Sequence, residues 1–254
     1  MNTILKFSSP NAKLRKTRAA VDAYLAAHDG QINGVRVKGS AIWSFNLPAY
    51  RYTDPRGVVR VTCPGADTCV ANCYANGQGH YSRPNVIKLR VDNAEALRAI
   101  YAAAGVDGVT EALSERIDAL PRTAGILRFH DSGDLFARWY RDAVINLATR
   151  YPDRLFYLYT KSIPLIPAVL PPNVAIVQSF GSKFDRRINM SRPHSIVFLT
   201  REDLLSRGYV DGSETDLPAI IGTTKIGLVY HGTRKAEIDQ IKASHRIAFG
   251  GVTA

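Results

Sequence analysis

The stretch ILRFHDSGDLFARWYRDAVINLATR, residues 126–150, decides the fold of this 254-residue chain. It begins with the apolar run Ile126–His130, continues through the polar segment Asp131–Asp134, and ends in an amphipathic pattern that predicts a helix over Leu135–Arg150. A buried strand followed directly by a helix is typical of the units that build parallel sheets. A fold of this kind requires the same order elsewhere in the chain.

Further apolar runs with strand character alternate with helical stretches over the rest of the chain. They cover Val58–Thr62, Leu155–Thr160, Val174–Phe180, Ser195–Thr200 and Ile226–Tyr230. Together with Ile126–His130 they make six predicted strands, and their alternation with helices predicts an α/β fold with a mostly parallel sheet.

The N-terminal part has a different pattern. Residues Pro10–His28 predict a helix, and the runs Val35–Lys38 and Ala41–Asn46, separated by Gly39, predict a hairpin. We expect residues 1–57 to form a small cap of helix and hairpin on an α/β core over residues 58–254, within one domain spanning residues 1–254.

Composition excludes several classes of protein. Apolar residues make up 46% of the chain and charged residues 22%, which is typical of a globular protein and excludes collagen, coiled coil and general disorder. No apolar run is long enough to cross a bilayer and the start of the chain lacks a signal peptide pattern, so we expect a cytoplasmic protein with no membrane partner.

The charge is strongly positive and uneven. The formal net charge is +11, and residues 1–60 contain ten basic and three acidic side chains. A positive field attracts polyanions, so the basic N-terminal region, with Lys13, Arg15, Lys16 and Arg18 on its helix, predicts a nucleic-acid partner. The alternative is a solvated helix face that has no partner.

All three cysteines of the chain lie close together. Cys63, Cys69 and Cys73 have the spacing C-x5-C-x3-C in a loop over residues 63–75 that follows a predicted strand. Iron–sulfur clusters are held by thiolates, and a four-iron cluster with three cysteines has one iron open to another ligand. The cysteines therefore predict a [4Fe–4S] cluster, or a [3Fe–4S] cluster after the open iron is lost.

Two alternatives to an iron–sulfur cluster remain open. Zinc bound by three cysteines and one histidine is a common structural site, and His80 follows Cys73 by seven residues. The three thiols could also be buried without any metal.

Polar side chains follow nearly every predicted strand. The carboxyl ends of parallel strands share one edge, where such folds place their active sites, although the same side chains could cap helices or be solvated charges. His130 would donate a proton or bind the open iron, the carboxylates would bind an ammonium group, and the lysine and arginine an anion. The candidate catalytic residues are His130, Asp131, Asp134 and Lys161, and the candidate cofactor-binding residues are Asp131, Ser132, Asp134, Lys161, Ser179 and Arg201.

Four motifs together resemble the gene product 88 family of actinobacteriophage proteins. They are KFSSPNAKL at residues 6–14, CYA at residues 73–75, FHDSGDLF at residues 129–136 and YTKS at residues 159–162. That family is itself similar to radical S-adenosylmethionine enzymes, whose partial (β/α)6 barrel has three cluster cysteines in the loop after its first strand.

The resemblance implies a partial (β/α)6 TIM-like barrel and a phage protein that acts in the cytoplasm of the infected host, on a host protein or another target. Cys63, Cys69 and Cys73 would be the cluster ligands, and Asp131–Asp134 would lie where radical enzymes hold the amino group of S-adenosylmethionine. The chain departs from the usual C-x3-C-x2-C spacing and has no Gly-Gly-Glu-Pro stretch.

Three functional hypotheses follow. The first is an iron–sulfur protein with radical-enzyme chemistry on S-adenosylmethionine. The second is a non-catalytic iron–sulfur module that senses redox state or binds nucleic acid or a host protein. The third is a zinc-stabilised nucleic-acid-binding domain.

Overall fold

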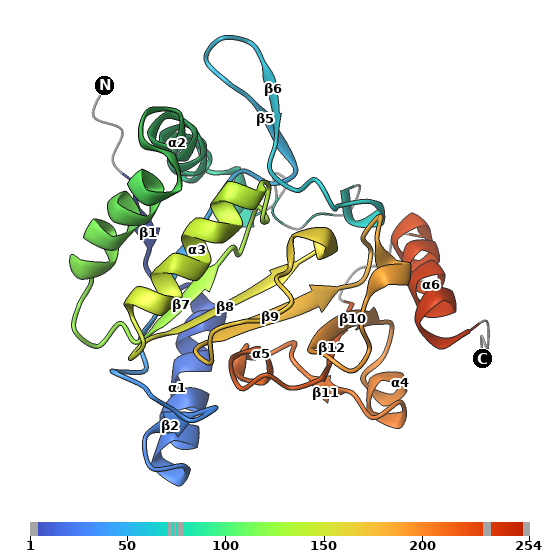
Figure 1. Ribbon diagram of the computed structural model, residues 1–254. Helices are drawn as coiled ribbons and strands as arrows, with labels where there is room; N and C mark the ends of the chain where they lie inside the picture. Colours follow the sequence, from blue (N-terminus) through green and yellow to red (C-terminus); the bar gives the residue numbers. More distant parts are fainter. Residues whose placement is uncertain (1–4, 71–72, 74, 76–78, 231–234, 251–254) are drawn as a thin grey trace.

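An eight-stranded, mostly parallel sheet forms the centre of the protein (Figure 1). The computed structural model describes residues 5–70, 73, 75, 79–230 and 235–250. In spatial order the strands are β1 (Phe7–Ser8), β4 (Ile42–Phe45), β7 (Ile126–Phe129), β8 (Leu155–Thr160), β9 (Val174–Ser179), β10 (His194–Phe198), β12 (Lys225–Val229) and β11 (Val210–Asp211).

Strand β1 is antiparallel to β4, and every other neighbouring pair in this sheet is parallel. The predicted α/β class with a mostly parallel sheet is therefore confirmed. A TIM-like barrel is not what the sheet forms, because β1 and β11 lie at its two edges and the described strands do not close on one another.

Helices cover both faces of the sheet. They are α1 (Ala12–Ala27), α2 (Pro84–Asp118), α3 (Arg138–Arg150), α4 (Arg201–Ser206), α5 (Leu217–Ile220) and α6 (Lys235–Phe249), with 3-10 turns η1 (Thr68–Val70), η2 (Gly79–Ser82), η3 (Ile163–Leu165) and η4 (Asp185–Arg187). In the described part of the chain, no helix combines the length and the apolar character needed to span a bilayer.

The apolar core lies on both faces of the sheet, because successive side chains of a strand point to opposite faces. In β8, Phe156 and Leu158 pack with α2 and α3 in one apolar cluster, whereas Leu155 and Tyr157 pack with α1 and α5 in another. A strand that is apolar throughout must therefore be covered on both faces.

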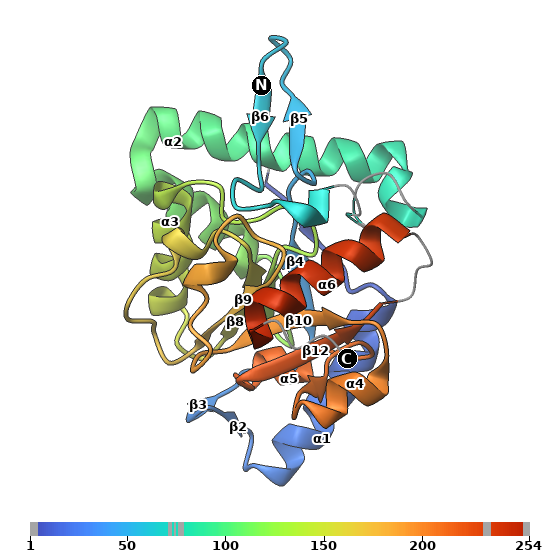
Figure 2. The ribbon, with the colours of Figure 1, turned by 90° about the vertical axis from the view of Figure 1, so that its right-hand side faces the viewer.

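The predicted strand Val58–Thr62 is not part of the main sheet. It forms β6 (Val59–Val61), which pairs only with β5 (Arg51–Thr53) in an antiparallel hairpin that projects from the body of the protein (Figure 2). Val59 and Val61 are exposed, so this apolar run does not mark a buried strand. The first parallel strand is β4 instead.

The predicted hairpin of Val35–Lys38 with Ala41–Asn46 is also wrong. β3 (Val35–Arg36) pairs with β2 (Gln31–Ile32), and β4 belongs to the main sheet rather than to an N-terminal cap. Asn33 and Gly34 both have positive φ, as the turn of a two-residue hairpin requires. The dipeptide Asn33-Gly34 was the missed sequence signal.

A buried ionic cluster joins α1, β7 and β8 to the start of α5. The carboxylate of Asp216 is fully buried and lies 2.8 Å from Nη1 of Arg128 and 2.9 Å from Nζ of Lys13. The hydroxyl of Tyr157 donates to the same carboxylate at 2.9 Å. Burial alone would raise the pKa of Asp216, but the charges of Arg128 and Lys13 outweigh it, so the pKa lies below its usual value.

We predict that Asp216→Asn lowers the free energy of unfolding by about 3–5 kcal/mol at neutral pH, because it removes the buried negative charge that faces Arg128 and Lys13. The lowered pKa of Asp216 means that its stabilising effect is present above about pH 4 and is lost as the pH falls through the folded-state pKa. Denaturant unfolding as a function of pH measures this loss, and the difference between wild type and variant should shrink in acid.

Glu214→Gln is the matched control, since Glu214 forms an exposed pair with Lys16 at 2.6 Å. Its effect should stay below about 1 kcal/mol. Equal effects of the two substitutions would contradict a stabilising role for the buried cluster.

Candidate functional site

A cavity of about 620 Å³ lies at the carboxyl edge of the sheet, where the predicted site residues come together. It is lined by the three cysteines and by polar residues that follow β7, β8 and β9, and helix α6 forms part of its wall. Of the predicted site residues, the lining includes Cys63, Cys69, Cys73, His130, Asp131, Ser132, Asp134, Lys161 and Ser179.

The loop that carries the cysteines is fastened to the ends of β8 and β9. Gly65 lies so close to Lys161 that a Cβ on it would come within 2.1 Å of the Lys161 carbonyl oxygen. The backbone N–H of Lys183 donates to the carbonyl of Gly65 at 2.9 Å, and the N–H of Asp67 donates to that of Gly181 at 3.3 Å. The loop is thus held against the carboxyl edge of the sheet.

The three thiols are close enough to influence one another electrostatically. Burial raises the pKa of Cys63 well above its ordinary value, and the charges of Asp134, Cys73 and Cys69 raise it further. Burial also raises the pKa of Cys69, although the ammonium of Lys161 acts in the opposite direction. Without a bound cation, these two thiols remain protonated at neutral pH.

In the described residues, no group of three or more His, Cys, Asp and Glu side chains is placed so that it could hold a metal ion. The side chain of His80, the predicted fourth ligand of zinc, lies outside what the structure describes.

Asp134 connects the ends of two strands. Its Oδ1 accepts hydrogen bonds from Oγ1 of Thr160 and the N–H of Leu135, and its Oδ2 accepts from the N–H of Lys161 and Oγ of Ser162. Burial raises the pKa of this carboxyl group and the hydrogen bonds lower it, with burial the larger influence. Asp134 does not cap a helix, because α3 begins only at Arg138.

Asp131 faces the cavity with a different set of partners. Its carboxylate lies 3.5 Å from Nη2 of Arg90, accepts from Nδ2 of Asn11 at 3.3 Å, and accepts from the hydroxyl of Tyr81 at 3.4 Å. These contacts are longer than those of Asp134. The hydroxyl of Ser132 donates to the carbonyl of Leu47 at 2.6 Å, which leaves it a structural role.

His130 is buried and uncharged. Its backbone has a φ of 82°, and its Nε2 lies 2.8 Å from the hydroxyl of Tyr140. Its Nδ1 has no hydrogen-bond partner among the described residues. Burial, aided by the charge of Arg128, lowers the pKa of His130 to about 3, so it carries no proton to donate as imidazolium at neutral pH.

The remaining predicted residues divide between the cavity and the surface. Nζ of Lys161 donates to the carbonyl of Phe180 at 2.8 Å, and Oγ of Ser179 lies 3.1 Å from Oγ of Ser195. Arg201 does not line the cavity; it forms an ion pair with Asp211 at 3.0 Å and its side chain is 71% exposed. The strand before Arg201 ends at Phe198, and α4 begins at Arg201 itself, so Arg201 is not brought together with the other predicted residues.

The basic helix α1 is only partly available to a polyanion. Lys13 points inward to Asp216, and Lys16 pairs with Glu214 on the surface. Arg18 lies 3.9 Å from Asp22. Binding of nucleic acid by this helix therefore stays a prediction.

Several residues of the cavity wall were not predicted to lie there. Asn11 and Lys13 come from the start of α1, Arg128 from β7, and Glu237 and Gln240 from α6. The only sequence signal for the first two was their place in the KFSSPNAKL motif. No pattern in the sequence indicated that α6 covers the cavity.

The four motifs of the sequence meet around this cavity. A family model described as "Gene product 88" matches residues 5–248. The chain belongs to the gene product 88 family. In this gene product 88 protein, Asn11 of the first motif contacts Asp131 of the third, and Lys161 of the fourth lies against the cysteine loop. No curated protein and no solved structure matches the chain.

We predict that Gly65→Ala displaces the cysteine loop, because the added methyl group would collide with the backbone of Lys161. In the metal-free protein, Cys63 should then react faster with a thiol reagent than it does in the wild-type chain, since burial protects it. The rate of thiol modification under native conditions measures the effect.

Gly57→Ala in the projecting hairpin is the control, since nothing lies within 4 Å of the added Cβ. It should leave the thiol reactivity unchanged. The same reactivity in wild type and Gly65→Ala would show that this close approach does not hold the loop.

Proposed function

We propose that this protein binds an iron–sulfur cluster through Cys63, Cys69 and Cys73 and that the cluster lies at one end of the cavity, beside a small-molecule site. The observation that carries the proposal is that the only three cysteines of the chain line one cavity together with the polar ends of β7, β8 and β9. Thiolates are the ligands that such clusters require.

Three thiolates are the donor set of a cluster that has one open iron. In an iron–sulfur cluster each thiolate binds a different iron, so the three sulfurs lie farther apart than they do around one zinc ion. Metal binding also overcomes a raised thiol pKa by displacing the proton. Lys161, whose ammonium lowers the pKa of Cys69, would offset part of the negative charge of the bound thiolates.

The topology supports a likeness to radical S-adenosylmethionine enzymes. The parallel strands β4, β7, β8, β9, β10 and β12 lie side by side in the order of the sequence, which is the strand order of a partial (β/α)6 barrel, and β1 and β11 are added at the two edges. The cysteines lie in the connection between β4 and β7, the first two of these strands. When bound, a cluster with an open iron supplies single electrons to a ligand on that iron.

The polar residues of the cavity would then have separate roles. Asp131, with its longer contacts, is the carboxylate that would hold the amino group of a ligand such as S-adenosylmethionine. Asp134 accepts four hydrogen bonds from the protein and would position the strand ends rather than touch the ligand. Neutral His130 would act only through uncharged hydrogen bonds.

The second candidate is a non-catalytic iron–sulfur module. It is favoured by the number of polar groups in the cavity that already bond to the protein. Ser132 and Lys161 both donate to backbone carbonyls, and Ser179 pairs with Ser195. A redox sensor needs the cluster but no ligand beside it.

We predict that Cys63→Ser, Cys69→Ser and Cys73→Ser each abolish or strongly reduce cluster binding, because each removes one of three thiolates. Anaerobic reconstitution with iron and sulfide, followed by iron and sulfide analysis and a visible absorption spectrum, measures the result. Thr68→Ser, in the same loop, is the control and should keep the wild-type iron content. Full iron content in all three cysteine variants would contradict the proposal, and stoichiometric zinc without sulfide would favour the third hypothesis.

We predict that the reconstituted protein, when reduced, cleaves S-adenosylmethionine to methionine and 5′-deoxyadenosine. Asp131→Asn should lower the yield about tenfold or more, the size of one lost charge-assisted hydrogen bond. Arg201→Ala should leave it unchanged, since Arg201 lies outside the cavity. Chromatography of the products measures both effects. A protein that keeps its cluster and forms neither product would be the non-catalytic module.

A further inference from the structure

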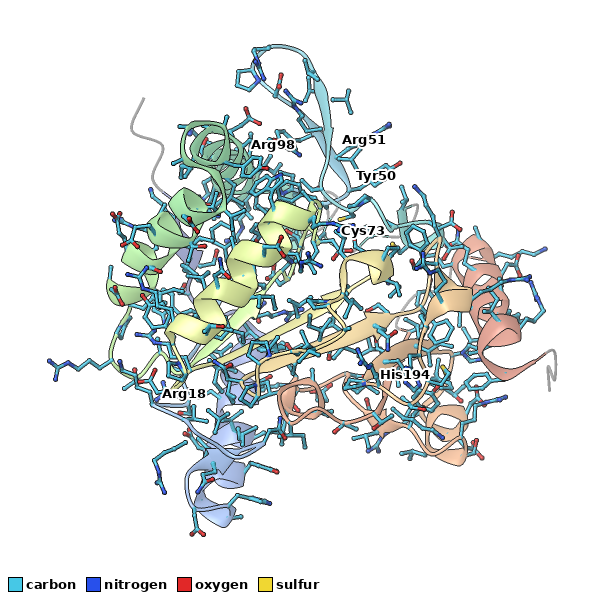
Figure 3. All side chains as sticks on the ribbon, viewed as in Figure 1. Arg18, Tyr50, Arg51, Cys73, Arg98 and His194 are labelled. Carbon is cyan, nitrogen blue, oxygen red and sulfur yellow. The ribbon has the colours of Figure 1, made fainter. Side chains whose placement is uncertain are left out.

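The β5–β6 hairpin is a two-stranded ribbon that projects from the protein beside the cysteine loop (Figures 1 and 2). One face of the ribbon packs on α2, where the hydroxyl of Tyr52 bonds to Glu95 and Nη2 of Arg98 donates to the carbonyl of Val61 at 3.5 Å. In the view of Figure 3, Arg98 lies on one side of the ribbon and Arg51 on the other.

The opposite face of the ribbon is exposed. Arg51 pairs in register with Val61, and Thr53 pairs with Val59, so these four side chains share that face. All four are exposed, and the side chain of Arg56 at the tip is 76% exposed. This face combines cations with apolar and hydroxyl groups and has no acidic side chain.

Two acidic residues near this surface, Asp54 and Asp185, are buried, whereas Asp67 in the cysteine loop is exposed. The carboxylate of Asp54 is fully buried; it accepts from the N–H groups of Arg56 and Val58 and pairs with Arg60 at 2.9 Å. Asp185, in the segment after β9, is also buried and accepts from the N–H groups of Gly181 and Ser182. The charges that these segments present outward are therefore mainly positive.

A second exposed cation extends this surface at the base of the ribbon. The N–H of Lys183 bonds to Gly65, two residues after Cys63, and its Nζ lies 3.3 Å from the carbonyl of Pro64. Arg186 follows in the same segment and is exposed. Arg51, Arg56, Lys183 and Arg186 thus lie on the ribbon and on the segment bonded to its base.

We propose that the β5–β6 ribbon is a binding element for double-stranded DNA: the ribbon enters the major groove, and Arg51, Arg56, Lys183 and Arg186 contact the phosphates on either side of it. The major groove admits a two-stranded ribbon and is about 8.5 Å deep. From Arg51 to the turn at Asp54 the strand rises about 10 Å, at about 3.3 Å per residue. The exposed valines and Thr53 suit contact with thymine methyl groups.

The ribbon is separate from helix α1, where Lys13, Lys16 and Arg18 pair with acidic side chains. On the ribbon, Arg56 also lies 3.5 Å from the carboxylate of Asp54, but 76% of its side chain is exposed. The ribbon also lies outside the cavity, because none of residues 51–61 lines it. Binding of DNA by the ribbon therefore does not depend on what the cavity holds.

The test compares two double variants of the full chain that change the net charge equally. Arg51→Ala with Arg56→Ala removes cations from the ribbon, and Lys16→Ala with Arg18→Ala removes exposed cations from α1. Fluorescence anisotropy of a labelled duplex, titrated at several salt concentrations, gives the slope of log affinity against log salt. The slope should fall by about 1.8 for the ribbon variant, at about 0.9 per phosphate contact, and stay unchanged for the α1 variant.

Arg51→Lys with Arg56→Lys should keep most of the salt dependence, and thermal unfolding should show that all variants fold. Equal losses in the ribbon and α1 variants, or no binding by the wild-type chain at low salt, would overturn the proposal. Single strands that bind as tightly as the duplex would overturn insertion into the groove. Polyglutamate that competes as well as unlabelled duplex would assign the surface to an acidic protein instead.

Discussion

Four hydrogen bonds converge on the carboxylate of Asp134, at the point where β7 and β8 reach the carboxyl edge of the sheet. They fix the end of β7 against Thr160, Lys161 and Ser162, and the cysteine loop packs in turn against the backbone of Lys161. The position of the cysteine loop therefore depends on Lys161, and the position of Lys161 depends on Asp134. A carboxylate is suited to this role because its two oxygens can accept several hydrogen bonds at once.

Much of the sheet was predictable because its strands are buried on both faces. The runs at Ile126–His130, Leu155–Thr160 and Val174–Phe180 are mostly apolar, as strands covered on both sides are, and each forms a strand of the main sheet. The run at Val58–Thr62 was equally apolar but belongs to the hairpin, so apolar character alone did not separate a buried strand from an exposed ribbon. Whether an apolar run is buried depends on the strand with which it pairs, and the residues of the run do not determine that partner.

For the site, local sequence indicated which residues gather but not what each one contacts. Polar residues after successive strands had to meet at one edge, which placed Asp131, Asp134, Lys161 and the cysteines around one cavity. The partner of Arg128 could not be inferred, since Asp216 lies 88 residues away in the chain. Contacts between residues this far apart in the sequence depend on how helices pack across the sheet.

The projecting hairpin enters and leaves the body at a single point. The carbonyl of Tyr50 accepts hydrogen bonds from the N–H groups of both Thr62 and Cys63, so residues 51–61 leave and rejoin the chain side by side. Beyond this closure, among the described residues, only the side that carries Tyr52 is fixed to the body, through the bond to Glu95 on α2. The tip, residues 55–58, is thus the part of the hairpin whose length or sequence can change while the cysteines that follow keep their place.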